Sequence, residues 1–380
     1  MATTVTVPVP HFFTESHRLQ LDDLLYEICQ ELQLSPFRHN QAEERYKAVA
    51  SALESEGSPF HNFHPRIYPQ GSMRLGTTVK PIEGPHDLDF VCELNIWHNG
   101  VAPLALLDGL FDFLRQYGPY RDMVSRKNRC VRITYADEFY MDVLPACRDL
   151  KAGGSCIQVP DRALRDWTPS NPIGYARWFD DRSRLDEKWL AAKAEPVPPQ
   201  QAVDEKTALQ LAVQLIKRWR DLYFNDPNLA PISVVLTTLG GCFYKGEGSV
   251  SAALSSILDA VVEAVAFAHL QGKRLLVLNP SNPAEDLSER WENSEAYRAF
   301  KLGIHQLRDD WKAILHSTSG IHQALEGLFG EPVRRALIKQ AHRLQEARKR
   351  SDLGIRSTGI ISSLASGTMP IPSNTFHGDR

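Results

Sequence analysis

Two aspartates at alternate positions, Asp87 and Asp89, stand at the start of an apolar segment that continues to Leu94. A short apolar run bounded by glycine and proline predicts a β-strand, and side chains at alternate positions of a strand point to the same face. Two carboxylates on one face are unfavourable unless a cation joins them. Because Mg²⁺ is usually held by one or two carboxylates together with phosphate and water oxygens, the segment predicts a magnesium-binding strand.

A Gly-Ser pair, Gly71-Ser72, precedes the two aspartates, and a third acid, Asp142, follows them. Glycine leaves backbone N–H groups unobstructed and serine adds a small hydroxyl, which together suit the terminal phosphates of a nucleotide. Asp142 is in the second arm of a hairpin predicted over residues 131–145. If this arm pairs with the first strand, three carboxylates could hold two metal ions about 4 Å apart, an arrangement used for phosphoryl and nucleotidyl transfer. Each motif alone is common, but their combination indicates catalysis.

Composition narrows the class of protein. The 380 residues are 43% hydrophobic and 23% charged, which excludes a disordered or collagen-like chain. The formal net charge of −3 argues against bulk electrostatic binding of nucleic acid. Six scattered cysteines without a CxxC pair favour neither a disulfide framework nor structural zinc. With no run of about 18 apolar residues and no basic leader, we expect a cytoplasmic protein without a membrane segment.

The order of apolar patterns predicts an α+β protein. Amphipathic helices are expected over 17–34 and 41–55, and strands between 66 and 143 with one helix over 103–116. The proline-rich segment 195–201 cannot continue a helix. Further helices are predicted beyond it, over 204–224, 231–243, 251–270, 284–315 and 332–350.

These patterns divide the chain into three parts. Residues 1–200 are predicted to form a catalytic lobe with N-terminal helices, and residues 201–350 a helical lobe. Residues 351–380 are rich in Ser, Gly, Pro and Thr, which favours a flexible C-terminal tail.

The motifs GSMRLGTTVKP, DLDF and MDVLPA resemble the nucleotidyltransferase superfamily typified by DNA polymerase beta. Within it they are similar to the bacterial CD-NTases, relatives of cyclic GMP-AMP synthase and oligoadenylate synthase, and the similarity covers about residues 40–315. The resemblance implies a mixed-sheet catalytic lobe with a helical C-terminal lobe, as in oligoadenylate synthase. It also implies synthesis of a cyclic di- or trinucleotide that activates an effector in antiphage (CBASS) signalling.

The resemblance also assigns roles to the three acids and the Gly-Ser pair. Asp87 and Asp89 would bind two Mg²⁺ ions, for which Mn²⁺ could substitute. Asp142 would bind the ion nearer the acceptor and help to deprotonate its ribose hydroxyl. Gly71 and Ser72 would hold the triphosphate of the donor, which could be ATP, GTP, UTP or CTP.

Other positions match the family pattern but have ordinary alternatives. Lys217 would contact phosphate, or else be a solvated charge on a helix. Ser233 would be a second phosphate contact, or a helix N-cap. Asn171 could recognise a base edge, or form a turn before proline. Arg74 and Lys80, which flank the phosphate turn, could add positive charge.

Rival functions remain open at this stage. A linear oligonucleotide synthase or an RNA-tailing nucleotidyltransferase would use the same chemistry, but should carry an RNA-binding surface. The clearest basic run, residues 343–350, is equally explained as a solvated helix face, so no obligatory nucleic acid is expected. A non-catalytic nucleotide-binding module would have no need for three metal carboxylates. The bases, linkage and ring size of a product cannot be deduced from these spacings.

The C-terminal tail raises a separate hypothesis. In some bacterial members of the family, operon-encoded proteins that resemble ubiquitin-transfer enzymes join a flexible C-terminus to other molecules. The tail here, ending in residues 376–380, would be accessible to such regulatory proteins.

Overall fold

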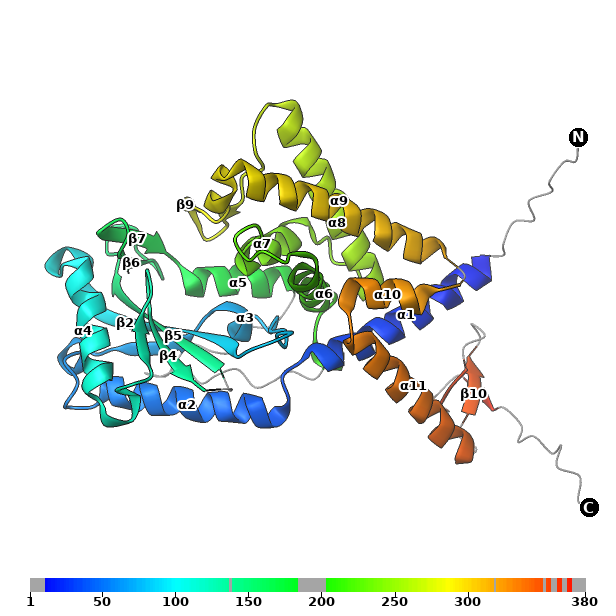
Figure 1. Cartoon of the computed structure of the whole chain (residues 1–380), viewed down its shortest axis with the longest axis horizontal. Helices are drawn as coiled ribbons and strands as arrows, with labels where there is room; N and C mark the ends of the chain where they lie inside the picture. Colours follow the sequence, from blue (N-terminus) through cyan, green and yellow to red (C-terminus); the bar gives the residue numbers. More distant parts are fainter. Residues whose placement is uncertain are drawn as a thin grey trace, which may run out of the picture.

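The computed structural model describes residues 11–136, 139–183, 203–317, 319–350, 353–356, 361–363 and 368–370. A mixed β-sheet with its helices forms one lobe, and a set of packed helices forms the other (Figure 1). The fold class predicted from the sequence is confirmed.

The sheet lobe is built on seven strands in the order β1-β2-β5-β4-β3, with β6 joined to β5 and β7 joined to β6. The parallel pair β2–β5 lies at its centre, and the other pairs are antiparallel. The hairpin predicted over 131–145 is the β4–β5 pair. The strands are β1 (Arg66–Pro69), β2 (His86–Trp97), β3 (Val124–Arg126), β4 (Val131–Tyr135), β5 (Phe139–Arg148), β6 (Ile157–Asp161) and β7 (Asp166–Ser170).

Two helices pack against this sheet, α2 (Pro36–Glu54) and α4 (Pro103–Gln116). Both begin with proline, which suits the first turn of a helix because its missing N–H has no partner there. Tyr46 of α2 stacks on Phe90 of β2 with ring centroids 4.4 Å apart, and its hydroxyl donates to the Ile67 carbonyl at 3.0 Å. These contacts fix α2 beneath the strand that carries the paired aspartates.

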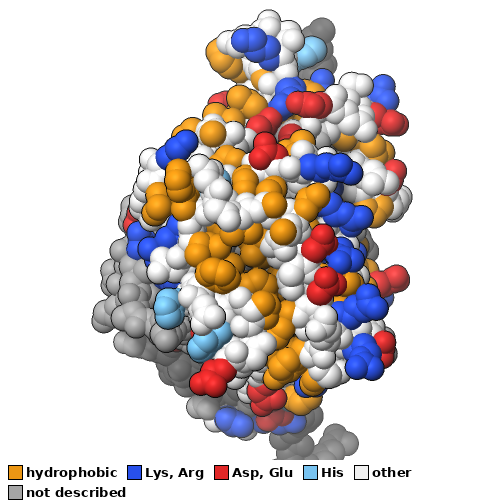
Figure 2. All heavy atoms as spheres, turned by 90° about the vertical axis from the view of Figure 1, so that its left-hand side faces the viewer, with side chains coloured by type: hydrophobic (Ala, Val, Ile, Leu, Met, Phe, Trp, Pro, Cys, Tyr) orange, Lys and Arg blue, Asp and Glu red, His pale blue; other side chains and the backbone are white. Residues whose placement is uncertain are grey.

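Figure 2 shows the face of the sheet lobe that lies at the left of Figure 1. Hydrophobic side chains are spread over its centre, while Lys and Arg side chains lie along one side with Asp and Glu among them. This mixture differs from the broad basic surface on which electrostatic capture of nucleic acid depends.

The helical lobe surrounds α6, whose side chains are buried along most of its length. A capping box between Thr207 and Gln210 fixes its start. The helices of this lobe are α1 (His11–Leu32), α5 (Pro172–Ser183), α6 (Ala208–Tyr223), α7 (Ser233–Phe243), α8 (Val250–Leu270), α9 (Ser294–His316), α10 (Ile321–Phe329) and α11 (Pro332–Lys349).

The single helix predicted over 284–315 is wrong in its first third. Residues 284–286 end the strand β9 (Asn282–Asp286), which pairs with β8 (Leu278–Asn279), and a 3-10 helix (Glu289–Glu292) follows before α9 begins. The reason is local hydrogen bonding, since the Asp286 carboxylate accepts from the backbone N–H and the hydroxyl of Ser288. Such side-chain bonds compete with helix formation.

Helix α1 belongs to the helical lobe, although the predicted division at residue 200 groups it with the catalytic lobe. Its side chains Leu25 and Ile28 are fully buried in the helical core, and α1 lies along α11. The Asp22 carboxylate also accepts from the backbone N–H and hydroxyl of Ser251, in the first turn of α8. The proline-rich boundary segment itself lies outside the described residues.

Among the described residues, helix α8 alone is long and apolar enough to cross a membrane, although the sequence predicts no membrane segment. It contacts α1, α6, α7 and α9, and half of its apolar window is buried. These contacts are those of a core helix.

Part of the predicted flexible tail has regular structure. Three short strands, β10 (Leu353–Arg356), β11 (Ile361–Ser363) and β12 (Thr368–Pro370), form a small antiparallel sheet in the order β11-β10-β12. Residues 371–380, including the proposed conjugation end, lie outside the described part of the chain.

The contact between α1 and α8 gives a test of this lobe arrangement. Asp22→Ala should lower the free energy of unfolding by about 2 kcal/mol, because it leaves two buried donors at Ser251 without an acceptor. Urea denaturation followed by circular dichroism measures the change. Gln30→Ala, at an exposed position of the same helix, should change stability by less than about 0.5 kcal/mol. Equal effects of the two substitutions would contradict the assignment of α1 to this core.

Candidate active site

The Gly-Ser turn forms a one-turn helix, α3 (Gly71–Arg74), directly after β1. Gly71 has a positive φ of 62°, which favours glycine. A Cβ added there would lie 2.5 Å from Oδ2 of Asp89, so no other residue fits without moving that carboxylate. The Gln70 N–H also donates to the Asp89 carbonyl at 2.8 Å. The phosphate turn predicted from the sequence therefore lies directly against the predicted metal-binding strand.

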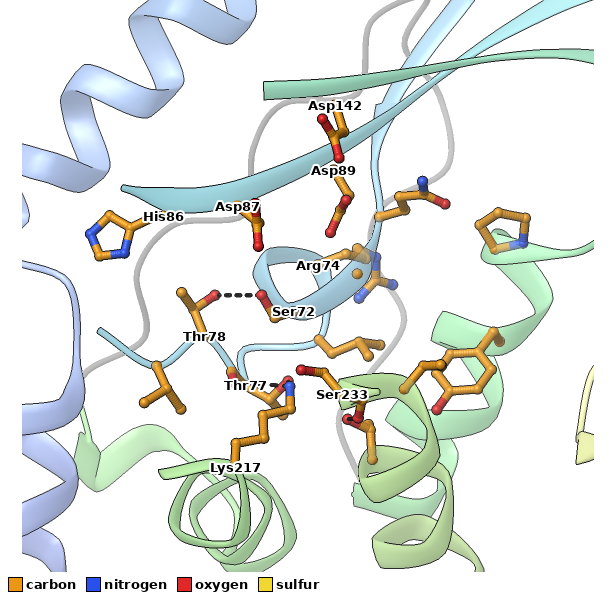
Figure 3. Close-up of a pocket in the computed structure, with 18 of the residues that line it drawn as sticks. Ser72, Arg74, Thr77, Thr78, His86, Asp87, Asp89, Asp142, Lys217 and Ser233 are labelled. Atoms are coloured by element: carbon orange, nitrogen blue, oxygen red, sulfur yellow. Dashed lines mark hydrogen bonds between the residues drawn. The ribbon is translucent and has the colours of Figure 1, made fainter. Parts of the chain in front are cut away.

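The parallel pairing of β2 and β5 places Asp89 and Asp142 at matching positions. Asp87 lies two residues earlier on β2, and all three carboxylates are on the side of the sheet that faces Ser72 (Figure 3). The structure thus brings together the three acids that the sequence singled out.

An arginine that the sequence analysis missed holds two of these acids. Arg132 of β4 is paired in register with Asp142, and its guanidinium donates to both Asp142 oxygens at 2.7 and 2.8 Å. It also reaches Asp87 at 3.3 Å. The available signal was its place opposite Asp142 in the predicted hairpin, between the apolar residues Val131 and Ile133.

The carboxylates strongly disfavour one another's charge. Burial, followed by the nearby Asp142 and Asp87 carboxylates, raises the pKa of Asp89 to about 7, while Arg132 and Lys217 oppose this shift. A divalent cation would relieve the repulsion, and the all-oxygen donor set suits Mg²⁺. Within the described residues no group of three His, Cys, Asp or Glu side chains is yet arranged to hold a metal ion. Arg132 pairs with Asp142 and Asp87 and so offsets part of the carboxylate charge.

The acids line one wall of a cavity of about 540 Å³ between the two lobes. This volume is in the range of small-molecule and cofactor sites. Lys80 and Asn171 do not line it. The other predicted residues do: Gly71, Ser72, Arg74, Asp87, Asp89, Asp142, Lys217 and Ser233.

Lys217 is buried on α6 and is therefore not a solvated helix charge. Its ammonium donates to the Thr77 hydroxyl at 2.9 Å and to the Thr77 carbonyl at 3.3 Å. Burial lowers the pKa of Lys217 to about 7. The Gln214 amide, one turn earlier on the same helix, donates to the Thr78 carbonyl at 2.6 Å. Helix α6 thus fixes the segment that follows the phosphate turn.

Ser233 is the first residue of α7, and Ile232 occupies the N-cap position. The predicted N-cap role is therefore wrong. The Ser233 hydroxyl accepts from the Arg220 guanidinium at 2.6 Å, and Arg220 also pairs with the adjacent Asp221. Arg220 was missed by the sequence analysis, although it follows Lys217 by three residues and so lies on the same helix face.

Asn171 and Arg74 have structural partners. The Asn171 side-chain oxygen accepts from the Gly174 N–H at 3.0 Å and from the Ser155 hydroxyl at 2.8 Å, and its amide donates to the Ser281 carbonyl at 3.0 Å. The side-chain oxygen and one amide N–H are thus used within the protein, and the side chain does not line the cavity, so these contacts favour the turn role over base recognition. Arg74 forms a two-point ion pair with Asp180 of α5.

Comparison with known proteins agrees with this geometry. A family model described as "Second Messenger Oligonucleotide or Dinucleotide Synthetase domain" matches residues 19–183. A "c-di-GMP synthase" of Roseivirga ehrenbergii is 31% identical, over 96% of this chain and 99% of the relative. "Cyclic dinucleotide synthase CdnG" of Bradyrhizobium diazoefficiens is 29% identical, over 82% of this chain and 81% of the relative.

Solved structures show the same fold. The Bradyrhizobium diazoefficiens CD-NTase CdnG in complex with GTP superposes with a TM-score of 0.71 at 28% identity, covering 83% of this chain and 96% of that one. Escherichia coli CdnC, solved in complex with a HORMA protein, gives a TM-score of 0.59 at 17% identity, over 79% of this chain and 94% of that one. This chain therefore belongs to the bacterial CD-NTase family of nucleotidyltransferases.

Proposed function

We propose that this chain joins two molecules of GTP into cyclic di-GMP with release of pyrophosphate. The convergence of Asp87, Asp89 and Asp142 over the Ser72 turn carries the catalytic part of this proposal. The choice of a guanine dinucleotide is supported by the c-di-GMP synthase that matches nearly the whole chain.

The reaction is an in-line attack of a ribose hydroxyl oxygen on the α-phosphate of a donor nucleotide. A new P–O bond forms, the bond between the α-phosphate and its bridging oxygen breaks, and pyrophosphate leaves. Asp87, Asp89 and Asp142 would hold two Mg²⁺ ions, which supply positive charge to the attacking and leaving oxygens. Asp142 accepts the proton of the acceptor hydroxyl. A second attack of the same kind within the linear intermediate closes the ring.

The triphosphate is held between the lobes. In Figure 3 the Ser72 hydroxyl and the α3 backbone lie on one side, and Lys217 and Ser233 lie on the other. Arg220, which also lines the cavity, donates to Ser233. The two cationic side chains neutralise the charge that gathers on the leaving pyrophosphate. Because phosphate would stabilise the ammonium form, binding raises the pKa of Lys217 back toward that of an exposed lysine.

The biological role is part of the same proposal. The cyclic product would serve as a second messenger in antiphage signalling, made in the cytoplasm. An operon-encoded regulator acting on the C-terminal tail stays a prediction, because the last ten residues lie outside the described part of the chain. A related CdnC has been solved with a HORMA partner.

The proposal is tested by product analysis. Purified protein incubated with GTP and Mg²⁺ should give a phosphatase-resistant product whose mass is one water less than that of the linear dinucleotide monophosphate. Mass spectrometry identifies it. A ladder of phosphatase-sensitive linear products would instead establish a linear synthase, and elongation only in the presence of RNA would establish a tailing enzyme. With all four nucleoside triphosphates present, a cyclic product without guanine would contradict the choice of GTP.

Removal of a metal carboxylate should abolish turnover while leaving the fold intact. Asp87→Ala and Asp89→Ala should each lower kcat by about 1,000-fold or more, because metal ions supply several kcal/mol of charge stabilisation and each 1.36 kcal/mol is a factor of ten. Pyrophosphate release measures the rate, and circular dichroism checks folding. Asp181→Ala, at an exposed position of α5, is the matched control and should leave the rate unchanged.

The raised pKa of Asp89 predicts a pH-dependent stability without metal. Between pH 4 and pH 7 the folded state holds a proton at Asp89 that the unfolded state releases, so this group makes stability fall as pH rises through that window. In EDTA at pH 8, Asp89→Asn should be more stable than the unsubstituted protein by roughly 1 to 4 kcal/mol, with little difference at pH 4. Thermal and urea unfolding measure this.

With added Mg²⁺ at pH 8, the unsubstituted protein should become more stable than Asp89→Asn. The ion binds and stabilises only the protein that retains the Asp89 carboxylate. Asp181→Asn controls for the loss of a surface charge. If Asp89→Asn is more stable than the unsubstituted protein by the same amount at pH 4 and pH 8, titration of Asp89 does not cause the pH dependence of stability.

A further inference from the structure

The hairpin β8–β9 contributes Asn279 and Glu285 to the lining of the cavity. It packs against β7, beside which it lies in Figure 1. Its turn is joined to the start of α5, because the Ser281 hydroxyl donates to the Asn171 carbonyl at 3.1 Å and the Ser281 carbonyl accepts from the Asn171 amide at 3.0 Å. The hairpin therefore has a fixed place relative to the cavity.

Asn279 is buried and its amide orientation is set by its partners. Its side-chain oxygen accepts from the Ser281 backbone N–H at 2.9 Å. Its amide nitrogen must then donate, and it does so to Oε2 of Glu285 at 2.8 Å. Asn279 thus orients one oxygen of the Glu285 carboxylate.

The second oxygen of Glu285, Oε1, receives no hydrogen bond from any residue that the structure describes. Burial raises the pKa of Glu285, with the Asn279 amide and the more distant Arg129 acting in the opposite direction. This oxygen is not among the buried unpaired side-chain atoms of the described residues, so it is accessible to a hydrogen-bond donor of a ligand in the cavity. Oε1 of Glu285 is therefore available to accept a hydrogen bond from a ligand in the cavity.

The charge distribution of the cavity decides which part of a nucleotide meets Glu285. Lys217 donates to Thr77, just after the phosphate turn, and Arg220 donates to Ser233, so a triphosphate is favoured at this part of the cavity. Asp87, Asp89 and Asp142 are proposed to bind metal ions that attract phosphate, whereas Glu285 would repel phosphate directly. A nucleotide would therefore place its base toward Glu285. Tyr175 and Leu287 also line the cavity and provide apolar surface for a base.

Among the common bases, guanine presents two neighbouring donors, N1–H and N2–H₂, on its Watson–Crick edge. A carboxylate with two acceptor oxygens matches that pair. Adenine presents a donor beside the N1 acceptor, which would face a carboxylate oxygen without a hydrogen between them. We propose that Glu285, oriented by Asn279, recognises the Watson–Crick edge of guanine and makes this site select GTP. This inference rests on the proposed synthesis of cyclic di-GMP.

The test compares substrates that differ at the recognised atoms. Inosine triphosphate lacks the N2 amino group of GTP, and ATP lacks both donors. In Glu285→Gln the carboxamide turns one acceptor into a donor, and in Glu285→Ala both acceptors are lost. We expect the ratio of kcat/KM for GTP to that for inosine triphosphate to fall by about 10- to 100-fold in both variants, since a hydrogen bond to a charged group is lost.

A second measurement uses an equimolar mixture of GTP and ATP, with products identified by mass spectrometry. The adenine content of the products should rise in the Glu285 variants. Glu289→Gln removes a nearby carboxylate that is exposed and does not line the cavity, and it should keep the ratio and product composition of the unsubstituted protein. A merely structural role of Glu285 would lower the rates with all nucleotides by the same factor and leave the ratios unchanged.

The outcomes separate the two proposals. If the unsubstituted protein makes cyclic di-GMP and both Glu285 variants keep its preference for GTP over inosine triphosphate and ATP, the assignment of Glu285 is overturned while the proposed function stands. If the unsubstituted protein makes no guanine-containing cyclic product from the mixture, the proposed function itself fails. Loss of preference in the Glu285 variants but not in Glu289→Gln supports both.

Discussion

Three carboxylates that repel one another are held together at the centre of the sheet, and the surrounding residues compensate for this repulsion. Parallel pairing of β2 with β5 sets Asp89 beside Asp142, and the register is held because Leu88, Phe90 and their β5 neighbours are buried on the opposite face. The carboxylates therefore cannot separate without exposing the core. Arg132 compensates part of their charge, and burial, together with the neighbouring Asp142 and Asp87 carboxylates, raises the pKa of Asp89. The site is held at a cost in stability that a bound cation would remove.

Helix α6 holds the segment after the phosphate turn against the helical lobe. Gln210, Gln214 and Lys217 follow one another at spacings of four and three residues, so they share one face of the helix. Each donates to the segment 75–78 that follows α3. Because α6 is in turn packed against α1, α7, α8 and α10, displacement of the turn would require displacement of the helical core. The rigid lobe thus positions groups that belong to the sheet lobe.

Local patterns in the sequence predicted the strands β2, β4 and β5, the β4–β5 hairpin and the convergence of Gly71 and the three acids, because alternation and spacing determine which side chains share a face. They did not predict β6 to β9. They did not reveal the guanidinium of Arg132 in the site, since arginine in a strand is usually solvated. The helical assignment of residues 284–293 failed because Asp286 and Ser288 form side-chain bonds that periodicity does not register. The lobe to which α1 belongs depends on contacts with residues more than 200 positions away, such as Ser251.

The cavity is electrically asymmetric, and this asymmetry is a property of the whole fold. Two of its cations, Lys217 and Arg220, come from one helix that is packed in the helical core, and two others, Arg74 and Arg132, are paired with aspartates. The Glu285 carboxylate comes from a hairpin attached to β7 and the start of α5. A nucleotide bound with its base and triphosphate exchanged would place phosphates against a carboxylate, at a cost that increases as water is excluded. The same two elements thus favour one orientation of the nucleotide, with its α-phosphate toward Asp87 and Asp89. Orientation and base selection then follow from one arrangement of charges.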